Sequence, residues 1–138
     1  MYLFHIMLFL TLWERCIKME EIYQYVTKGR IVIQHDTYNG IEYAITTIGH
    51  PCAYIILDRG HPFINQCKMG DFSDLVHGGI TFDNISLPPL VSMKDNKHIY
   101  GWDYNHYGDC SILFNCEGIL WTVDEIMEDV TRMIDYIV

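Results

Sequence analysis

Two glycine-rich segments of the sequence hold the side chains best suited to metal chemistry. One is His77-Gly78-Gly79, and the other is residues 101–109, in which Asp, His and Asp follow one another at a spacing of three. Imidazole nitrogens and carboxylate oxygens are good ligands for zinc, and also for manganese and iron. Because glycines favour loops, which can turn several side chains onto one point, we expect one metal site from both segments. Its predicted ligands are His77, Asp103, His106 and Asp109.

Further site residues are expected beside these ligands. Gly78, Gly79 and Gly108 would let the backbone come close to a bound group, because glycine has no side chain. His61, in Gly60-His61-Pro62, is a weaker candidate, and its alternative role is that of a turn residue before proline. Each histidine also has a plainer alternative, which is a hydrogen-bonded structural role without a metal.

Nucleophilic catalysis has less support. Cys110 follows Asp109 and lies near His106, which would allow a Cys–His pair, but a buried structural thiol is the preferred interpretation. The sequence contains no G-x-S-x-G, P-loop or H-E-x-x-H motif. Its five cysteines include no C-x-x-C pair, which favours reduced, mostly buried thiols over a disulfide framework. Tyr104 and Tyr107 could line a pocket beside the aspartates, although packing is the preferred role for both.

The elements that must position these residues form an α+β pattern. β-Branched runs predict strands at residues 30–35 and 41–48, joined by Asn39-Gly40, a dipeptide that supplies the positive φ of a hairpin turn. We therefore expect a small, mostly antiparallel sheet. Shorter strands are expected at 53–57, 79–82, 98–102 and 110–114, with an irregular loop at 84–97 and weak helical character at 20–27.

The clearest element is a helix at residues 122–137. Apolar residues recur there at i, i+3, i+4 and i+7, and Thr122 with Glu125 matches a capping box. The apolar face should pack on the sheet, which gives an α+β fold closed by a C-terminal amphipathic helix. The other face should be solvated or, as an alternative, should bind a partner through Asp124, Glu128 and Asp135. The polar residues of that face are Asp124, Glu125, Glu128, Asp129, Arg132 and Asp135.

Composition indicates one globular domain at residues 19–138. The 138 residues are 50% hydrophobic and 14% aromatic, which excludes a disordered acidic tail. The net charge of −9 excludes a nonspecific nucleic-acid binder, which needs a basic surface. Residues 2–13 form an apolar run that is short for a membrane span of about 20 residues. We expect residues 1–18 to be an apolar leader upstream of a true translation start at Met19; a signal or anchor and a packed N-terminal element are the alternatives.

Three segments together resemble a family of small phage and prophage proteins. They are residues 52–62, which run from a cysteine to Gly60-His61-Pro62, then VHGGITF at 76–82 and YGWDYNHYGD at 100–109. A C-terminal helix that begins with WTVDE follows them. The resemblance covers roughly residues 50–137 and implies a mobile-element origin with a shared site at the matching positions. Tyr104 and Asn105 stand where relatives often have Cys and Ala, so a ligand role for that cysteine is not carried over. The matching positions are His61, His77, Gly78, Gly79, Asp103, His106, Gly108 and Asp109.

Three functional hypotheses follow. The first is an acidic protein, stabilised by zinc, that acts in the cytoplasm of the host bacterium. It would inhibit a defence effector by binding the basic surface of that effector, by analogy with anti-CRISPR proteins, which inhibit effector nucleases. The second is a metal-dependent hydrolase acting on a phosphate-containing small molecule, in which an open coordination position activates water. The third is a metal-free domain whose motif residues form a hydrogen-bonded polar core. We expect no direct contact with nucleic acid and no membrane association.

Overall fold

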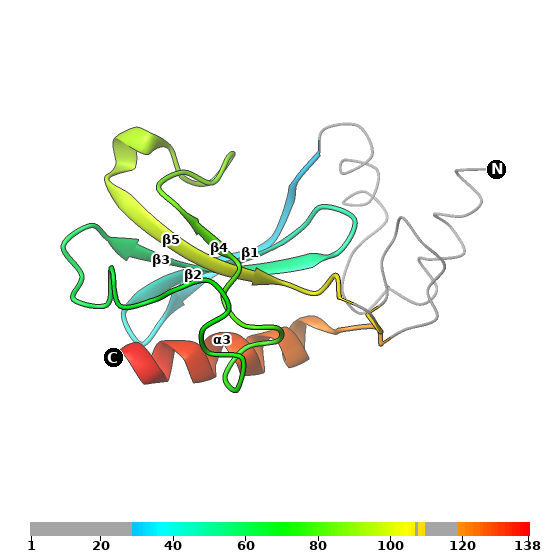
Figure 1. Cartoon of the computed structure of the whole chain (residues 1–138). Helices are drawn as coiled ribbons and strands as arrows, with labels where there is room; N and C mark the ends of the chain where they lie inside the picture. Colours follow the sequence, from blue (N-terminus) through cyan, green and yellow to red (C-terminus); the bar gives the residue numbers. More distant parts are fainter. Residues whose placement is uncertain (1–28, 107, 110–118) are drawn as a thin grey trace.

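The computed structural model describes residues 29–106, 108–109 and 119–138. These residues form a five-stranded antiparallel sheet with one α-helix lying across a face (Figure 1), which confirms the expected α+β class. The strands lie in the order β1-β2-β3-β5-β4. Their bounds are β1 Ile31–Tyr38, β2 Ile41–Thr47, β3 Pro51–Asp58, β4 Phe82–Asn84 and β5 Lys97–Asp103, and the helix, α3, is Val123–Ile137.

The hairpin between β1 and β2 follows from its turn residues. Asn39 and Gly40 have φ angles of 52° and 81°. A two-residue hairpin turn of the favoured hand needs two such left-handed residues in succession. The register pairs Tyr38 with Ile41 directly across the turn. The first two predicted strands and their turn are therefore confirmed.

Helix α3 packs its apolar face on the sheet, as predicted. The Thr122 side chain accepts the Glu125 backbone N–H, and the Glu125 carboxylate accepts that of Thr122, so the capping box forms. The helix buries four side chains that join one core cluster with Ile55, Tyr100 and Trp102 of the sheet. These four side chains, each at most 1% exposed, are Ile126, Val130, Met133 and Ile134.

The opposite face of the sheet is covered by the segment between β4 and β5. Leu87 bridges to Val91, and both side chains join a second core cluster with Ile56 and Ile99. A short 3-10 helix, η1 (Met93–Asp95), follows before β5 begins. The expected loop at 84–97 therefore covers the centre of this face, and the sheet has a buried cluster on each side.

The prediction of a strand at 79–82 is wrong in its position. Gly78 and Gly79 both have positive φ angles, of 73° and 77°, which interrupt an extended chain. The Ile80 backbone N–H donates to Asp71 O at 2.9 Å instead of joining a sheet ladder. The Thr81 N–H donates to Gly101 O at 2.9 Å, and strand β4 begins at Phe82, which lies opposite Gly101 of β5.

Some expectations fall on other parts of the chain. The predicted strand at 110–114, the helical segment at 20–27, the leader at 1–18 and Tyr107 lie outside the described residues. Cys52 and Cys67 are buried and free, as expected for reduced thiols, and the other cysteines also lie outside the described part. Within the described part of the chain, no helix is long and apolar enough to cross a membrane.

Candidate metal centre

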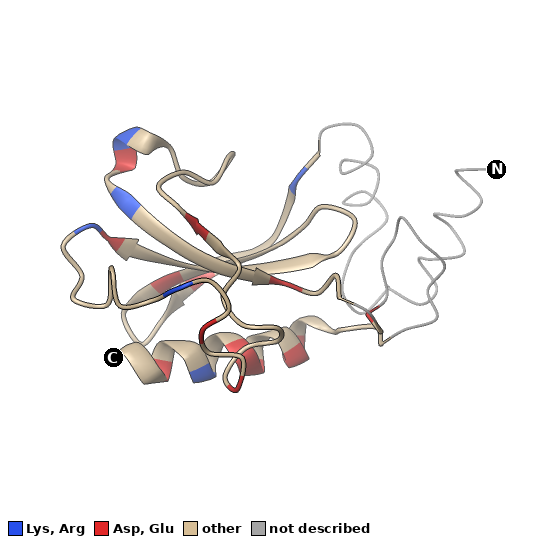
Figure 2. Cartoon of the chain, in the orientation of Figure 1, with Lys and Arg blue, Asp and Glu red and all other residues tan. Residues whose placement is uncertain are grey.

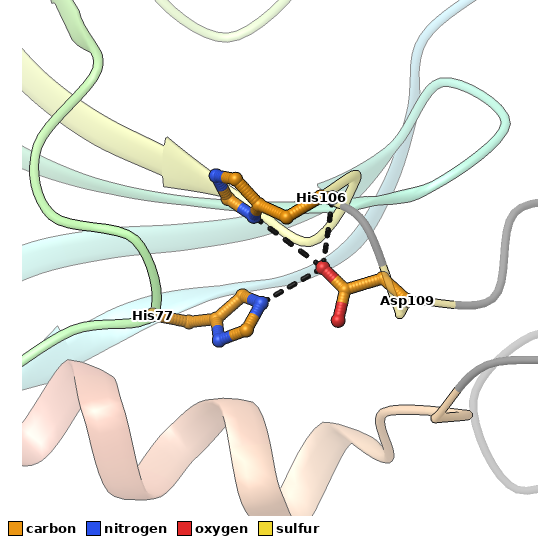
Figure 3. A group of neighbouring side chains, drawn as sticks. All are labelled: His77, His106 and Asp109. Atoms are coloured by element: carbon orange, nitrogen blue, oxygen red, sulfur yellow. Dashed lines mark hydrogen bonds and ion pairs between the residues drawn. The ribbon is translucent and has the colours of Figure 1, made fainter.

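His77, His106 and Asp109 converge beyond the carboxyl end of β5 (Figure 3). His77 Nε2 lies 2.8 Å from Asp109 Oδ2, and His106 Nδ1 lies 3.3 Å from the same oxygen. The three ligand atoms all lie within 4.8 Å of one another. Ligand atoms around a tetrahedral ion with bonds of about 2.1 Å stand about 3.4 Å apart. This group can therefore hold a metal ion.

The two glycines after His77 let the two motif segments meet. A Cβ at Gly78 would lie 2.5 Å from His106 Nε2, so the His106 ring rests against the bare glycine. A Cβ at Gly79 would lie 2.7 Å from the backbone oxygen of Gly70. Both glycines are therefore required by close contacts as well as by their positive φ angles. A Cβ at Gly108, which has a φ of 96°, would meet no other described residue within 4 Å, so there its positive φ angle is what favours glycine.

Asp109 is the buried centre of the group, with a side chain only 2% exposed. Burial raises the pKa of this carboxyl, but hydrogen bonds from the His106 backbone, the Trp121 indole and His77 outweigh it and hold the pKa below its ordinary value. The indole donates to Oδ1 at 2.8 Å, while the His106 N–H donates to Oδ2 at 2.9 Å. Since Oδ1 is taken by the indole, Oδ2 is the oxygen that both histidine rings face.

Aromatic rings surround His77. The Tyr104 ring stacks on it with an interplanar angle of 3° and a centroid distance of 5.1 Å. The Trp121 ring lies 4.7 Å from the His77 centroid at 48°, and the His106 ring lies 4.9 Å away, edge-on. Tyr104 is 0% exposed, which confirms the packing interpretation over the pocket-lining one.

Asp129 is the residue that the helix pattern misplaced. It belongs by spacing to the polar face of α3, yet it is only 6% exposed. Its Oδ2 accepts the Tyr104 hydroxyl at 2.6 Å and the His77 backbone N–H at 3.2 Å, and its Oδ1 pairs with Arg132. Arg132 in turn donates to Leu75 O at 3.0 Å. A solvated Asp129 is therefore a wrong expectation, because the loop before His77 packs on that side of the helix.

Asp103, the fourth predicted ligand, lies beside the group and not within it. Its Oδ1 is 3.8 Å from His106 Nδ1, and its side chain is 34% exposed. His50, which the sequence analysis did not single out, lies nearby because Pro51 O accepts the Tyr104 backbone N–H at 2.9 Å. Burial lowers the pKa of His50, while the neighbouring carboxylate of Asp103 acts to raise it. Among the described residues, Asp103 and His50 are thus polar side chains close to the candidate site.

His61 is not part of this group. It follows the end of β3 that pairs with the start of β5, whereas His106 follows the end of β5. The length of β5, about 20 Å, therefore separates the two histidines along the sheet. His61 Nδ1 accepts the Phe63 backbone N–H at 3.1 Å, which is the turn role considered as its alternative. A cavity of about 440 Å³ beside His61 is lined by the ion-paired Glu42 and Lys97.

The predicted partner-binding carboxylates of α3 differ in their surroundings. Asp124 and Glu128 are exposed on the helix. Asp135 is also exposed, but its carboxylate accepts the Tyr38 hydroxyl at 3.2 Å and the Asn39 amide at 3.3 Å. Figure 2 shows acidic residues along the helix, with a single basic position among them. The helix therefore presents a mainly acidic outer surface.

The chain matches no protein-family model, no curated protein and no solved structure. The resemblance to phage proteins therefore stays a prediction from the sequence motifs. The geometry of the group fits a bound metal ion, and it also fits the metal-free polar core of the third hypothesis. The same atoms that can bind a metal ion also form hydrogen bonds with one another, so a metal-free polar cluster uses the same contacts.

Proposed function

We propose that this protein binds a zinc-class divalent ion through His77 Nε2, His106 Nδ1 and Asp109 Oδ2, and that it hydrolyses small phosphate-containing molecules. The observation that carries the proposal is that ligand atoms of these three residues lie within 4.8 Å of one another, with His77 Nε2 2.8 Å and His106 Nδ1 3.3 Å from Asp109 Oδ2. Two imidazoles and one carboxylate form a ligand set typical of zinc sites. The indole of Trp121, bonded to the other oxygen of Asp109, is the kind of outer partner that orients a ligating carboxylate.

The number of ligands favours the hydrolase over a purely structural metal, because the described residues offer three ligand atoms at this group. Catalytic zinc sites have three protein ligands and one position for water, whereas structural sites have four protein ligands. The histidine side chains are 27% and 36% exposed, for His77 and His106 respectively, so solvent reaches the group. A bound ion of this kind would lower the pKa of a water molecule to about 7 and so supply a nucleophile at neutral pH. The chain's own residues would hold the ion and exclude solvent from the Asp109 side.

A hydrolysis assay with matched variants tests this proposal. The purified protein is loaded with zinc or manganese and offered p-nitrophenyl phosphate and bis(p-nitrophenyl) phosphate. We expect metal-dependent release of nitrophenol that is lost in Asp109→Asn and retained in Asp135→Asn, a control with the same charge change on the exposed helix surface. Hydrolysis that survives in Asp109→Asn, or a metal-loaded protein with no hydrolysis, would count against the hydrolase.

Protein binding is the second candidate function, and the acidic surface of α3 favours it. Asp124 and Glu128 are exposed there, and an acidic surface can dock on the basic nucleic-acid channel of an effector nuclease such as a CRISPR nuclease. The test is inhibition of DNA cleavage by a purified RNA-guided nuclease. Inhibition that weakens in an Asp124→Asn, Glu128→Gln double variant and at raised salt would support this function. Unchanged cleavage at a large excess of the protein would exclude it for that nuclease.

A further inference from the structure

We infer that Asp129 and Tyr104 form a buried unit that positions the ligand His77, and that this unit sets the metal affinity of the site. The inference deepens the proposed metal site and rests on it. Both residues are positioning residues, because neither contributes an atom to the group of ligands. The Asp129 carboxylate contacts the backbone of His77, and the Tyr104 ring contacts its imidazole.

Asp129 fixes the backbone of His77 from the helix. Its Oδ2 accepts the His77 N–H at 3.2 Å, across 52 residues of sequence. The other oxygen is held by Arg132, which also donates to Leu75 O in the loop that leads to His77. In Figure 3, the helix runs along the same side of the site as His77. One carboxylate therefore attaches the ligand-bearing loop to a rigid element.

Tyr104 fixes the ring of the same histidine. Its hydroxyl donates to Asp129 Oδ2 at 2.6 Å and accepts the Trp102 indole N–H at 2.9 Å, so the phenol is held at its far end. Its ring lies parallel to the His77 ring, with an interplanar angle of 3°. Because the stacked ring limits rotation of the imidazole, Nε2 remains directed at Asp109, 2.8 Å away.

The hydrogen bonds around Asp129 are more than a packed core requires. A carboxylate buried to this degree is unfavourable unless hydrogen bonds and charge satisfy it, and an apolar side chain would fill the same flank of the helix without that penalty. Here the carboxylate has three partners, and two of them, His77 and Tyr104, lead to one metal ligand. Outer partners of this type usually change metal affinity by about 10–100-fold when they are removed.

Two variants test the unit by different routes. Tyr104→Phe keeps the stacked ring and removes the hydroxyl that Asp129 holds, while Asp129→Asn keeps the size of the side chain and removes its charge. The control is Asp135→Asn, six residues along the same helix, where the described hydrogen-bond partners of the carboxylate are Tyr38 and Asn39 of the exposed β1–β2 turn. Each variant is first shown to be folded by its cooperative urea unfolding curve.

Cobalt binding supplies a readout that a merely structural role would not change. We expect Tyr104→Phe and Asp129→Asn to bind Co²⁺ about 10–100-fold more weakly than the unaltered protein and to change its visible ligand-field spectrum. Asp135→Asn should match the unaltered protein in both respects. Folded Tyr104→Phe and Asp129→Asn proteins with unaltered affinity and spectrum would overturn the inference.

A second readout separates this inference from the metal proposal. In the metal-free protein, the ring C–H resonance of His77, assigned by its loss in His77→Gln, should move in Tyr104→Phe and Asp129→Asn and stay in place in Asp135→Asn. If the unaltered protein binds no Co²⁺ while the His77 resonance moves as expected, the metal proposal fails and the positioning of His77 stands. A His77 resonance that is the same in all three variants overturns the positioning role.

Discussion

Replacing Gly78 by alanine should separate metal binding from folding stability. A Cβ at this position would lie 2.5 Å from His106 Nε2 and 2.6 Å from His106 Cε1. Both atoms belong to the far end of a side chain that can rotate away, so the contact displaces the ring and leaves the fold intact. Because non-bonded atoms separate to about 3.5 Å, the ring must move by about 1 Å.

The expected loss of stability comes from the backbone alone. Gly78 has a φ of 73°, and a residue with a side chain costs about 1–2 kcal/mol in this conformation. Gly40 and Gly108 have φ angles of 81° and 96°, and a Cβ at either would meet no described residue within 4 Å. The three alanine variants should therefore lose similar free energies of unfolding. Only Gly78→Ala should also lose metal affinity, by about 10–100-fold, because only it moves a ligand.

Two measurements on the three variants check this reasoning. Urea unfolding gives the free energy of unfolding, and competition with a chromogenic chelator gives the zinc affinity. Gly40→Ala is the control for backbone strain away from the site, and Gly108→Ala is the control for strain beside it. The reasoning is refuted if Gly78→Ala binds zinc as tightly as Gly108→Ala does. It is also refuted if all three variants lose affinity alike.

Three further predictions concern the fold around the site. Gly79→Ala should destabilise the protein by about 2–5 kcal/mol, which is more than Gly40→Ala should. The reason is that the new Cβ would lie 2.7 Å from the backbone oxygen of Gly70, which cannot rotate away. Equal urea midpoints for the two variants would contradict this prediction. Thr122→Ala should lower the free energy of unfolding by about 1 kcal/mol through loss of the capping box, whereas Thr131→Ala, inside the helix, should not. Burial raises the pKa of the Cys52 thiol to about 11. At pH 8 only about one thiol in a thousand is then ionised, so iodoacetamide should label Cys52 far more slowly in the native protein than in urea, and equal rates would refute its burial.

The sequence was sufficient where local chemistry decides the structure. Asn39-Gly40 predicts the β1–β2 turn because few other residues adopt two successive positive φ angles, and the structure has them at 52° and 81°. Thr122 and Glu125 predict the start of α3 because the capping bonds form within one turn of helix. Three of the four predicted ligands, His77, His106 and Asp109, lie together in the candidate metal group, because glycines beside His77 and after β5 let distant segments approach each other.

The sequence was insufficient where contacts between distant segments decide. Asp129 lies by spacing on the polar face of α3, but it immediately precedes the fully buried Val130, at the edge of the apolar stripe. Whether such an edge position is solvated depends on what packs beside it, and here that is Tyr104 and the loop before His77. Asp103 shares the spacing of three with His106, yet as the last residue of β5 its side chain leaves from the strand. The spacing of residues in the sequence shows neither the burial of Asp129 nor the position of the Asp103 side chain.

The metal content of the purified, tag-free protein tests the central claim most directly. Elemental mass spectrometry is applied to the unaltered chain, to His106→Ala and to His98→Ala, a control histidine that pairs with Asp83 elsewhere on the sheet. The account predicts about one zinc-class ion per chain in the unaltered protein and in His98→Ala, and none in His106→Ala. A metal-free unaltered protein after growth and dialysis with zinc, or equal metal in His106→Ala, would contradict it.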